Sequence, residues 1–295
     1  NKIHSPLELL RSGRFGRVED LRGAITFYRL SGRLANLIYS LNTTNTDFYP
    51  YQFKPVLQFL DSPCQGILIA DEVGLGKTIE AGLIWTELRA RFDARRLLIL
   101  CPAMLTEKWR DELSNRFGIS AQICSANELL TRLRKLADKP QEPFALIASH
   151  QGLRPPKGWD DKEQESKAAS AQLAHFLDTR QFEDPLFDLA IVDEAHYMRN
   201  PETQTNKLGR LLRPVCDNLI LLSATPIQLK SQDLFHLLNL IDEDAFPYPT
   251  SFQETLEANG PIVHLRDKLL AGPMSKSEFV EAIEDAYFYR IFEDN

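Results

Sequence analysis

The chain lacks several features that mark whole classes of protein. No apolar run approaches the roughly 20 residues of a membrane-spanning helix, and no signal-peptide pattern opens the sequence. No internal repeat or low-complexity tract is present. The four cysteines are far apart and form no CxxC pair, which is typical of reduced, mostly buried thiols rather than of a zinc site or a disulfide framework (Cys64, Cys101, Cys124 and Cys216). These absences predict a globular, cytoplasmic protein with no membrane partner.

Positive charge is too scarce for a protein that coats nucleic acid with its whole surface. The 295 residues carry a net charge of −7, and this charge is unevenly spread. Residues 1–40 carry +4, residues 41–240 carry −3, and residues 241–295 carry −8. The arginines of the first segment fit either a face that contacts phosphates or a solvated helix face. The acidic end is not expected to contact nucleic acid.

Length and apolar patterning together predict the fold class. At about 150 residues per domain, the length fits two domains or one large domain with attachments, and the start at Asn1 rather than Met is typical of a fragment. Five apolar runs read as strands that are covered on both faces, as in a parallel sheet. These runs are 66–70, 97–101, 144–148, 189–192 and 219–222.

The segments between these runs have the spacing of helices. Leu105, Trp109, Leu113 and Phe117 recur every four residues among charged ones, so they predict a helix whose stripe packs into the core. The alternation predicts an α/β fold of three layers with a mostly parallel sheet. Residues 154–185 are polar and read as a surface insertion that carries one helix. After about 245 the strands stop, and 262–292 read as helical with an interruption near Gly272.

A glycine-containing loop after the first run is the strongest chemical motif. Asp71–Thr78 reads DEVGLGKT and leads into a helical segment. Glycines let backbone N–H groups turn toward a phosphate, and the N-terminus of the following helix adds positive potential. Lys77 can reach the β- and γ-phosphates of a nucleotide, and the Thr78 hydroxyl can ligate Mg²⁺. The strict P-loop pattern GxxxxGK[ST] has glycine where this chain has Asp71.

Polar residues also follow the fourth and fifth runs. Asp193 can join the Mg²⁺ shell and Glu194 can polarise the attacking water, although an acidic pair before a turn is often only solvated or a helix cap. Ser223 and Thr225 can cap the next helix or relay the state of the γ-phosphate. Because these motifs end strands of one predicted sheet, they predict an ATP-binding crevice at the carboxyl edge of that sheet.

Together these motifs resemble the first RecA-like lobe of superfamily-two helicases, and among them the Swi–Snf family of DNA translocases, particularly its bacterial members. DEVGLGKTIEAGLI is similar to the first motif of that family, including the Asp71 that departs from the strict pattern. Asp193–His196, with the following YMRNPETQT, resembles the second motif. LLSATPIQLKSQDLFHLLNLID resembles the third motif and its trailing helix. The resemblance covers roughly residues 48–245.

The resemblance implies a role for each matching position. Gln52 would read the edge of adenine, unless its segment is only the start of an amphipathic helix. His150 would follow a DNA strand by a loose match, unless it is structural. Nucleotide contacts are implied for Gln52, Gly74, Leu75, Gly76, Lys77, Thr78 and Ile79. Catalytic roles are implied for Lys77, Asp193, Glu194 and His196. The resemblance implies that Thr78 and Asp193 ligate magnesium. It also implies that Ser223 and Thr225 couple the nucleotide state to closure of the second lobe. DNA contacts are implied for Pro102, Ala103, His150 and Arg199.

The resemblance also indicates what this chain does not contain. The motor of the family needs a second RecA-like lobe, which carries an arginine finger, and residues 246–295 are too few, too acidic and too poor in predicted strands to form it. The predicted organisation is a basic helical extension at 1–45, a RecA-like lobe at 46–245 and an acidic helical segment at 246–295. We therefore expect the ATP-binding lobe of an ATP-dependent double-stranded-DNA translocase. It would hydrolyse ATP to ADP and phosphate when completed by the second lobe, and only weakly alone.

Two alternatives remain open at this point. The lobe fits a strand-separating helicase or a restriction-type motor subunit, and it also fits a nucleotide-gated protein-interaction module without translocation. Glu194 argues against the interaction module, because a lobe that no longer hydrolyses ATP does not need it. The expected partners are double-stranded DNA, the second lobe of the same parent chain, and a protein that acts in transcription or in defence against phage.

Overall fold

The computed structural model describes most of the chain beyond its first 48 residues. The described residues are 39, 49–62, 64–71, 74–136, 142–161, 167–180, 184–224, 231–245 and 247–271. Contacts divide the chain into two units, Asn1–Thr44 and Asn45–Asn295, and every described residue except Tyr39 belongs to the second. The predictions for the basic extension and for Gly272 onward fall outside this part of the chain. No described helix is long and apolar enough to cross a membrane.

The described residues form one sheet of six parallel strands, in the order β1-β6-β5-β2-β4-β3. All five predicted runs are confirmed as strands. The sixth strand, β3 (Gln122–Ile123), is two exposed residues at the sheet edge, so no apolar pattern marks it. The other strands are β1 (Gly66–Ile69), β2 (Arg96–Cys101), β4 (Phe144–Ser149), β5 (Phe187–Val192) and β6 (Cys216–Leu222).

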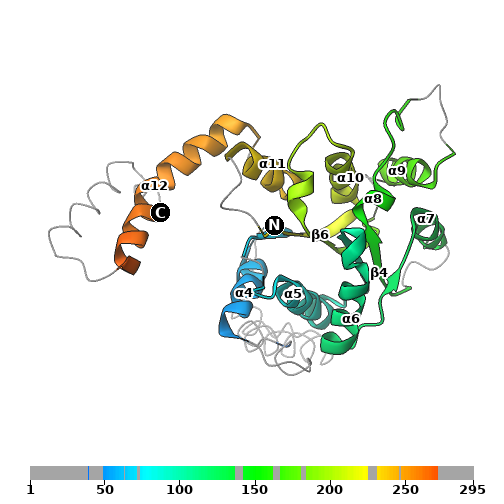
Figure 1. Cartoon of the computed structure of the whole chain (residues 1–295), viewed down its shortest axis with the longest axis horizontal. Coiled ribbons are helices and arrows are strands. Elements are labelled where there is room, and N and C mark those ends of the chain that lie inside the picture. Colours follow the sequence, from blue (N-terminus) through cyan, green and yellow to red (C-terminus); the bar gives the residue numbers. More distant parts are fainter. Residues whose placement is uncertain are drawn as a thin grey trace, which may run out of the picture. The chain divides into compact units, whose positions relative to one another are not determined.

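Helices cover both faces of the sheet and complete the predicted three layers (Figure 1). One face carries α4 (Lys54–Asp61), α5 (Lys77–Phe92) and α6 (Thr106–Phe117). The other carries α7 (Ala126–Lys135), α9 (Ala169–Arg180), α10 (Gln204–Leu212) and α11 (Ser231–Ile241). The remaining helical segments are η1 (Pro50–Phe53), η2 (Ala103–Leu105), α8 (His150–Leu153), η3 (Ala195–Met198), η4 (Arg213–Val215) and α12 (Pro249–Ala271).

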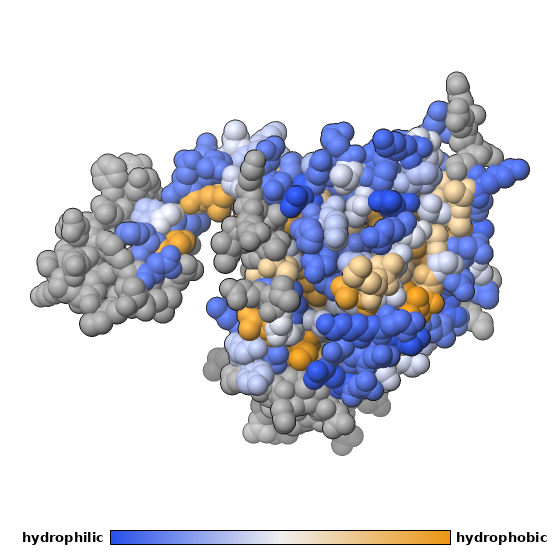
Figure 2. Space-filling view, viewed as in Figure 1, coloured by the Kyte–Doolittle hydropathy of each residue, from blue (hydrophilic) through white to orange (hydrophobic). Residues whose placement is uncertain are grey.

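Burial on both faces explains why the strands read as continuous apolar runs. Leu98 and Leu100 belong to the main core cluster, which also contains residues of α7, α9, α10 and α11. Leu97 and Ile99 alternate with them along β2 and are equally inaccessible to solvent. In α6, the side chains of Trp109, Leu113 and Phe117 are buried, which confirms the predicted core stripe. Polar residues cover most of the described surface seen in Figure 2, and apolar ones gather there in small patches.

The prediction of a surface insertion at 154–185 is only partly right. The segment does carry one helix, α9, but Leu173 and Leu177 of that helix have no exposed surface and lie in the main core cluster. Helix α9 packs against α7 and α10, so it is part of the layer that covers the sheet. The strongly polar residues before the helix concealed this short apolar stripe. Helix α12 likewise begins at Pro249, earlier than the predicted helical segment.

All four cysteines are free thiols, as the sequence predicts. Cys101 and Cys216 are fully buried, whereas Cys64 and Cys124 are partly exposed. Burial raises the pKa of the Cys101 and Cys124 thiols to about 12, which keeps both protonated at neutral pH.

Candidate nucleotide-binding site

The three chemical motifs lie along one edge of the sheet. Because β1, β6 and β5 are adjacent and parallel, their carboxyl ends lie side by side. The Ser223 N–H after β6 donates to the carbonyl of Ile69 in β1 at 3.0 Å. The Asp193 N–H after β5 donates to the carbonyl of Leu100 in β2 at 2.7 Å. The loop after β1, the acidic pair and Ser223 therefore lie along the same edge of the sheet, as predicted.

The glycine-containing loop at residues 71–78, which we call the phosphate loop, has at Gly74 and Gly76 the backbone shape that glycine allows. Gly74 and Gly76 both have a φ of +93°, in the left-handed region where a side chain would be strained. Gly76 caps α5, and its carbonyl accepts hydrogen bonds from the N–H groups of Ile79 and Glu80 at 2.7 and 3.1 Å. The helix therefore starts directly at the loop, with its positive end toward the place where phosphates would lie. Leu75 is 40% exposed between the two glycines.

The side-chain amide of Gln52 supports this loop through a hydrogen bond. Its Nε2 donates to the carbonyl of Leu75 at 3.2 Å, and its Oε1 accepts from the backbone N–H of Tyr49 at 3.2 Å. A Cβ on Gly76 would stand 2.5 Å from Gln52 Nε2, so a side chain there would displace this amide from the loop. The side chain of Gln52 is buried, and both ends of its amide are used within the chain. Each end of the amide can make one more hydrogen bond, so reading adenine, as the resemblance implies, does not require either of these bonds to be given up.

Lys77 lies across the loop. Its Nζ donates to the backbone carbonyl of Asp71 at 2.7 Å, so the ammonium group is held over the start of the loop. An incoming phosphate offers a charged acceptor in place of this neutral carbonyl, and charge-assisted bonds are about twice as strong. The lysine is thus positioned for the phosphate contact that the sequence predicts.

Glu80 is a residue whose environment the sequence does not reveal. It lies one turn into α5 and has no exposed surface. Burial, and then the negative charge of Asp71, raises the pKa of Glu80 to about 8. The carboxyl group is therefore mostly neutral at pH 7 and does not compete with a phosphate for the nearby Lys77.

Asp193 is held by two donors from opposite directions. The indole Nε1–H of Trp109 donates to Oδ2 at 2.8 Å, and the backbone N–H of Glu194 donates to Oδ1 at 2.9 Å. Trp109 is 2% exposed and belongs to α6, so the aspartate is fixed by a helix that lies 84 residues earlier in the chain. Trp109 therefore packs in the core, as predicted, and also orients a site residue, which the sequence does not indicate.

Glu194 begins a tight turn that directs the rest of the acidic motif. Its φ is +52°, one of two positive values among the described non-glycine residues, and such strain often occurs at functional sites. His196 Nδ1 lies 3.0 Å from Glu194 Oε2, and the ring of Tyr197 lies against that of His196. Glu194 and His196 are both partly exposed, so a bound nucleotide and water can reach them.

The donor set suits Mg²⁺. Magnesium prefers oxygen ligands and is usually bound by one or two protein groups together with phosphates and waters. Thr78 supplies a hydroxyl and Asp193 a carboxylate whose position is already fixed. Within the described residues, no three His, Cys, Asp or Glu side chains gather as a metal site. Ser223 is buried at the same edge, and Thr225 lies outside the described residues.

The residues predicted to contact DNA follow β2, β4 and β5 at the same edge of the sheet. Pro102 and Ala103 begin the turn η2 that leads into α6, and Ala103 is exposed. Arg199 is exposed at the end of η3. His150 is 2% exposed, and burial lowers its pKa to about 4, although the backbone of Leu100 and Asp193 beside the ring opposes this shift. A neutral, buried imidazole does not offer a phosphate contact, so the structure favours the structural alternative for this residue.

Replacing Trp109 with Phe tests the link between α6 and the acidic motif. The change keeps most of the buried ring but removes the hydrogen bond to Asp193, so we expect ATP hydrolysis or the affinity for Mg²⁺ to fall about 10- to 100-fold. The measurement is ATPase rate against Mg²⁺ concentration, with thermal unfolding to monitor stability. Trp85→Phe is the matched control, because Trp85 is as buried and its Nε1 has no partner. Equal effects of both changes would show that Trp109 acts only through packing.

Known proteins resemble this chain over most of its described length. The family described as the SNF2-related domain matches residues 34–272. The RNA polymerase-associated protein RapA of Pseudomonas putida GB-1 is 28% identical over 252 residues, which is 83% of this chain and 24% of that protein. RapA of Pseudomonas savastanoi pv. phaseolicola 1448A is 27% identical over 265 residues, or 88% of this chain and 25% of that protein. The chain thus spans about a quarter of the length of these relatives.

Two solved structures share the fold. The SWI2/SNF2 ATPase core of Sulfolobus solfataricus in complex with double-stranded DNA superimposes with a TM-score of 0.52 at 16% identity, covering 84% of this chain and 59% of that one. The SWI2/SNF2 ATPase core domain of Sulfolobus solfataricus, in a second structure, gives a TM-score of 0.51 at 18% identity, covering 74% of this chain and 40% of that one. This likeness confirms the RecA-like α/β fold that the sequence predicts.

Proposed function

The chain belongs to the SNF2-related domain family, and from this premise we propose that it is the ATP-binding lobe of a motor that translocates on double-stranded DNA. Membership makes it a helicase-like ATPase domain. The observation that carries the proposal is the convergence of the phosphate loop, Ser223 and Asp193 at the carboxyl ends of the adjacent strands β1, β6 and β5. This edge joins a phosphate cradle to a carboxylate pair, as ATP hydrolysis requires.

Each residue of the edge has a separate task in the proposed hydrolysis. The N-terminus of α5 and Lys77 bind the β- and γ-phosphates, and Lys77 leaves the Asp71 carbonyl to do so. Glu194 accepts a proton from the attacking water and orients it toward the γ-phosphate. Thr78 and Asp193 would hold Mg²⁺, which when bound neutralises charge on the phosphates. Ser223 and Thr225 would report the loss of the γ-phosphate to the second lobe.

The turns that follow β2 and β5 at this edge support the DNA part of the proposal. Ala103 and Arg199 are exposed after β2 and β5, on the same side of the sheet as the nucleotide loop. A turn that starts a helix can bind a backbone phosphate through its N–H groups, and such contacts follow the duplex without reading its sequence. The related ATPase core was solved in complex with double-stranded DNA, which favours duplex over single strands as the track.

Exposed apolar residues at this edge fit a surface that a second lobe covers. Single exposed apolar residues are common, but here several stand beside the motifs. Tyr51 and Leu75 flank the phosphate loop, where the Tyr51 hydroxyl donates to the Leu75 carbonyl at 3.1 Å. Met104 and Tyr197 follow β2 and β5, and they are 87% and 52% exposed. Closure of the second lobe of a longer parent protein onto this edge would bury them.

The choice of nucleic acid discriminates this proposal from a strand-separating helicase. We expect the ATPase rate of the parent protein to rise on adding blunt duplex DNA and to respond less to single strands of the same sequence. Lys77→Ala should abolish both the stimulated and the basal rate, because it removes the phosphate contact. Lys108→Ala, on α6, serves as a control for loss of one positive charge. Stronger stimulation by single strands would instead favour the helicase alternative.

A protein partner is proposed from the relatives alone. The relatives named above are RNA polymerase-associated proteins, so an association of the parent protein with the transcription machinery is one expectation. Co-purification of the parent protein with RNA polymerase, followed by reconstitution from pure components, would test it.

A further inference from the structure

A cavity lies at the amino edge of the sheet, opposite the edge that carries the candidate nucleotide site. It has a volume of about 340 Å³ and is bounded by the ends of α4 and α5 and by the amino ends of β5 and β6. This volume is near the lower end of the roughly 300–1,000 Å³ typical of ligand pockets. Nothing in the proposed hydrolysis uses this cavity.

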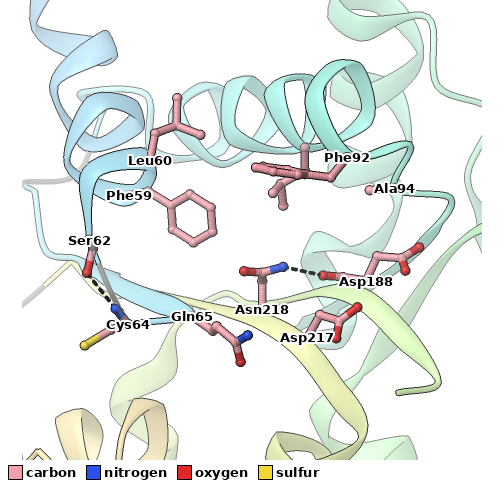
Figure 3. A pocket seen from close by; sticks show the side chains of 11 residues that line it. Phe59, Leu60, Ser62, Cys64, Gln65, Phe92, Ala94, Asp188, Asp217 and Asn218 are labelled. Atoms are coloured by element: carbon pink, nitrogen blue, oxygen red, sulfur yellow. Dashed lines mark hydrogen bonds between the residues drawn. The ribbon is translucent and has the colours of Figure 1, made fainter. Parts of the chain in front are cut away.

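The two walls of the cavity differ in chemistry (Figure 3). Phe59 of α4 and Phe92 of α5 point their rings in from the helical side. Asn218 of β6 points toward them from the sheet side, and the Asp217 carboxylate lies beside it in the same wall, on the side of Asp188. Phe92 is 69% exposed although it is a large aromatic residue, so its ring is available at the mouth of the cavity. The cavity thus combines aromatic faces with hydrogen-bond acceptors.

Asp188 shares the polar wall, but its charge is already balanced. Its Oδ1 accepts from Arg96 Nη2 at 3.1 Å, and its Oδ2 accepts from the backbone N–H groups of Arg95 and Arg96 at 2.6 and 2.7 Å. These bonds lower the pKa of Asp188 despite its burial, so it stays ionised. This residue is a fixed negative charge in the cavity wall rather than a vacant acceptor.

Asp217 is the acceptor that remains. Within the described residues its carboxylate makes no hydrogen bond or ion pair at contact distance. Burial, and then the charge of Asp188, raises the pKa of Asp217, although Arg96 and Arg213 oppose this shift from farther away. Asn218 donates its Nδ2 to the carbonyl of Asp188 at 3.0 Å, which leaves its Oδ1 as a second acceptor. A cation that enters here would relieve the unfavourable charge of Asp217.

We propose that this cavity is a docking site for an arginine side chain on an extended segment of a partner protein. A guanidinium group is flat, carries five N–H donors and stacks on aromatic rings, so it can stack on the exposed ring of Phe92 while donating to Asn218 and Asp217. Lysine is a poorer fit, because its ammonium group is compact and strongly hydrated.

The position of the site lets the partner bind while the motor works. The nucleotide loop follows the carboxyl end of β1, whereas Gln65 at the cavity precedes the amino end of that strand. A partner at this edge therefore leaves the crevice open to ATP and the second lobe. This inference does not depend on the proposed function, since the cavity is as available in an inactive lobe.

The test uses the 295-residue chain and three peptides of the form acetyl-Leu-X-Leu-amide, in which X is arginine, lysine or citrulline. Citrulline keeps the shape of arginine but not its charge. Binding is followed by NMR through the side-chain amide signals of Gln65 and Asn218. We expect the arginine peptide to shift both signals, and the citrulline peptide to bind at least about tenfold more weakly. Equal binding of arginine and citrulline peptides would overturn the proposal.

Variants separate the charge from the apolar wall. Asp217→Asn keeps the shape of the side chain and should weaken the arginine peptide about tenfold, as should Phe92→Ala, whose exposed ring is not needed for folding. Asp111→Asn, at an exposed position on α6, is the matched control and should leave binding unchanged. An unchanged affinity in Asp217→Asn, or no binding of the arginine peptide at millimolar concentration, would refute the site. If the peptide binds this chain but not the longer parent protein, a segment of the parent fills the cavity and the partner assignment is wrong.

Discussion

Changing Glu194 to Gln is expected to reduce the rate of ATP hydrolysis by the parent protein about 10²- to 10⁴-fold, which is the usual contribution of a general base. The amide of Gln has the same shape as the carboxylate but cannot accept a proton from water. Binding of ATP should change little, because Lys77 and the N-terminus of α5 are untouched. The measurements are the DNA-stimulated steady-state rate and the equilibrium affinity for ATP, made on the same preparation.

The control for this change is another glutamate on the same face of the domain. Glu107→Gln, on the exposed surface of α6, removes one negative charge without touching the site and should leave the rate unchanged. If Glu194→Gln left the DNA-linked activity of the parent protein intact, the carboxylate would have no catalytic task. The nucleotide-gated interaction module would then replace the translocase as the better reading of the lobe.

The fold was largely predictable because parallel strands buried on both faces leave a strong pattern. Each of the five apolar runs became a strand, since a run such as 97–101 buries alternate residues in two different cores. The exceptions are short or diluted patterns. Strand β3 has only two residues and both are exposed, whereas Leu173 and Leu177 form a core stripe next to a strongly charged segment. In the segment before α9, the many charged residues hid the short apolar periodicity of the helix.

The candidate site was predictable where a motif is contiguous and not where the contact is between distant segments. The loop 71–78 and the pair Asp193 and Glu194 indicate a nucleotide site by their residue types and by their positions directly after strands. The bond from Trp109 to Asp193 joins positions 84 apart, and the bond from Gln52 to Leu75 joins positions 23 apart. No spacing rule connects such pairs, because the pairing depends on which helix packs over which strand end.

The sequence also does not predict which individual polar residues are buried. Helix α5 buries residues around most of its circumference, from Glu80 to Leu88, so its apolar periodicity is weak and the face of a given residue cannot be assigned. Glu80 and Glu87 are both fully buried there, which their residue type argues against. His150 is the converse case, because the resemblance suggests a contact for DNA and the packing hides the ring.

Hydrolysis by the 295-residue chain alone is expected to be about 10³- to 10⁵-fold slower than by the parent protein on duplex DNA, the range that an arginine finger supplies in related phosphoryl-transfer systems. The chain holds the phosphate loop, Lys77, Asp193 and Glu194, so its affinity for ATP should remain within an order of magnitude of that of the parent. What it lacks is the positive charge that the second lobe is proposed to bring to the γ-phosphate as the transition state forms. The loss should therefore appear in the rate and not in binding.

Single-turnover hydrolysis under saturating ATP separates these two quantities, and Lys77→Ala in the isolated chain defines the background from contaminating ATPases. Steady turnover by the isolated chain at the rate of the parent, abolished by Lys77→Ala, would mean that one lobe completes the site and that the second lobe serves only movement. Weak binding together with slow turnover would point instead to a nucleotide pocket formed by both lobes. Slow turnover with intact binding fits the geometry described here, in which Gln52 supports the loop, Trp109 orients Asp193, and Leu75 and Met104 stand exposed where the second lobe would close. We therefore expect a lobe that is preorganised for holding ATP and whose barrier to hydrolysis is lowered only on closure.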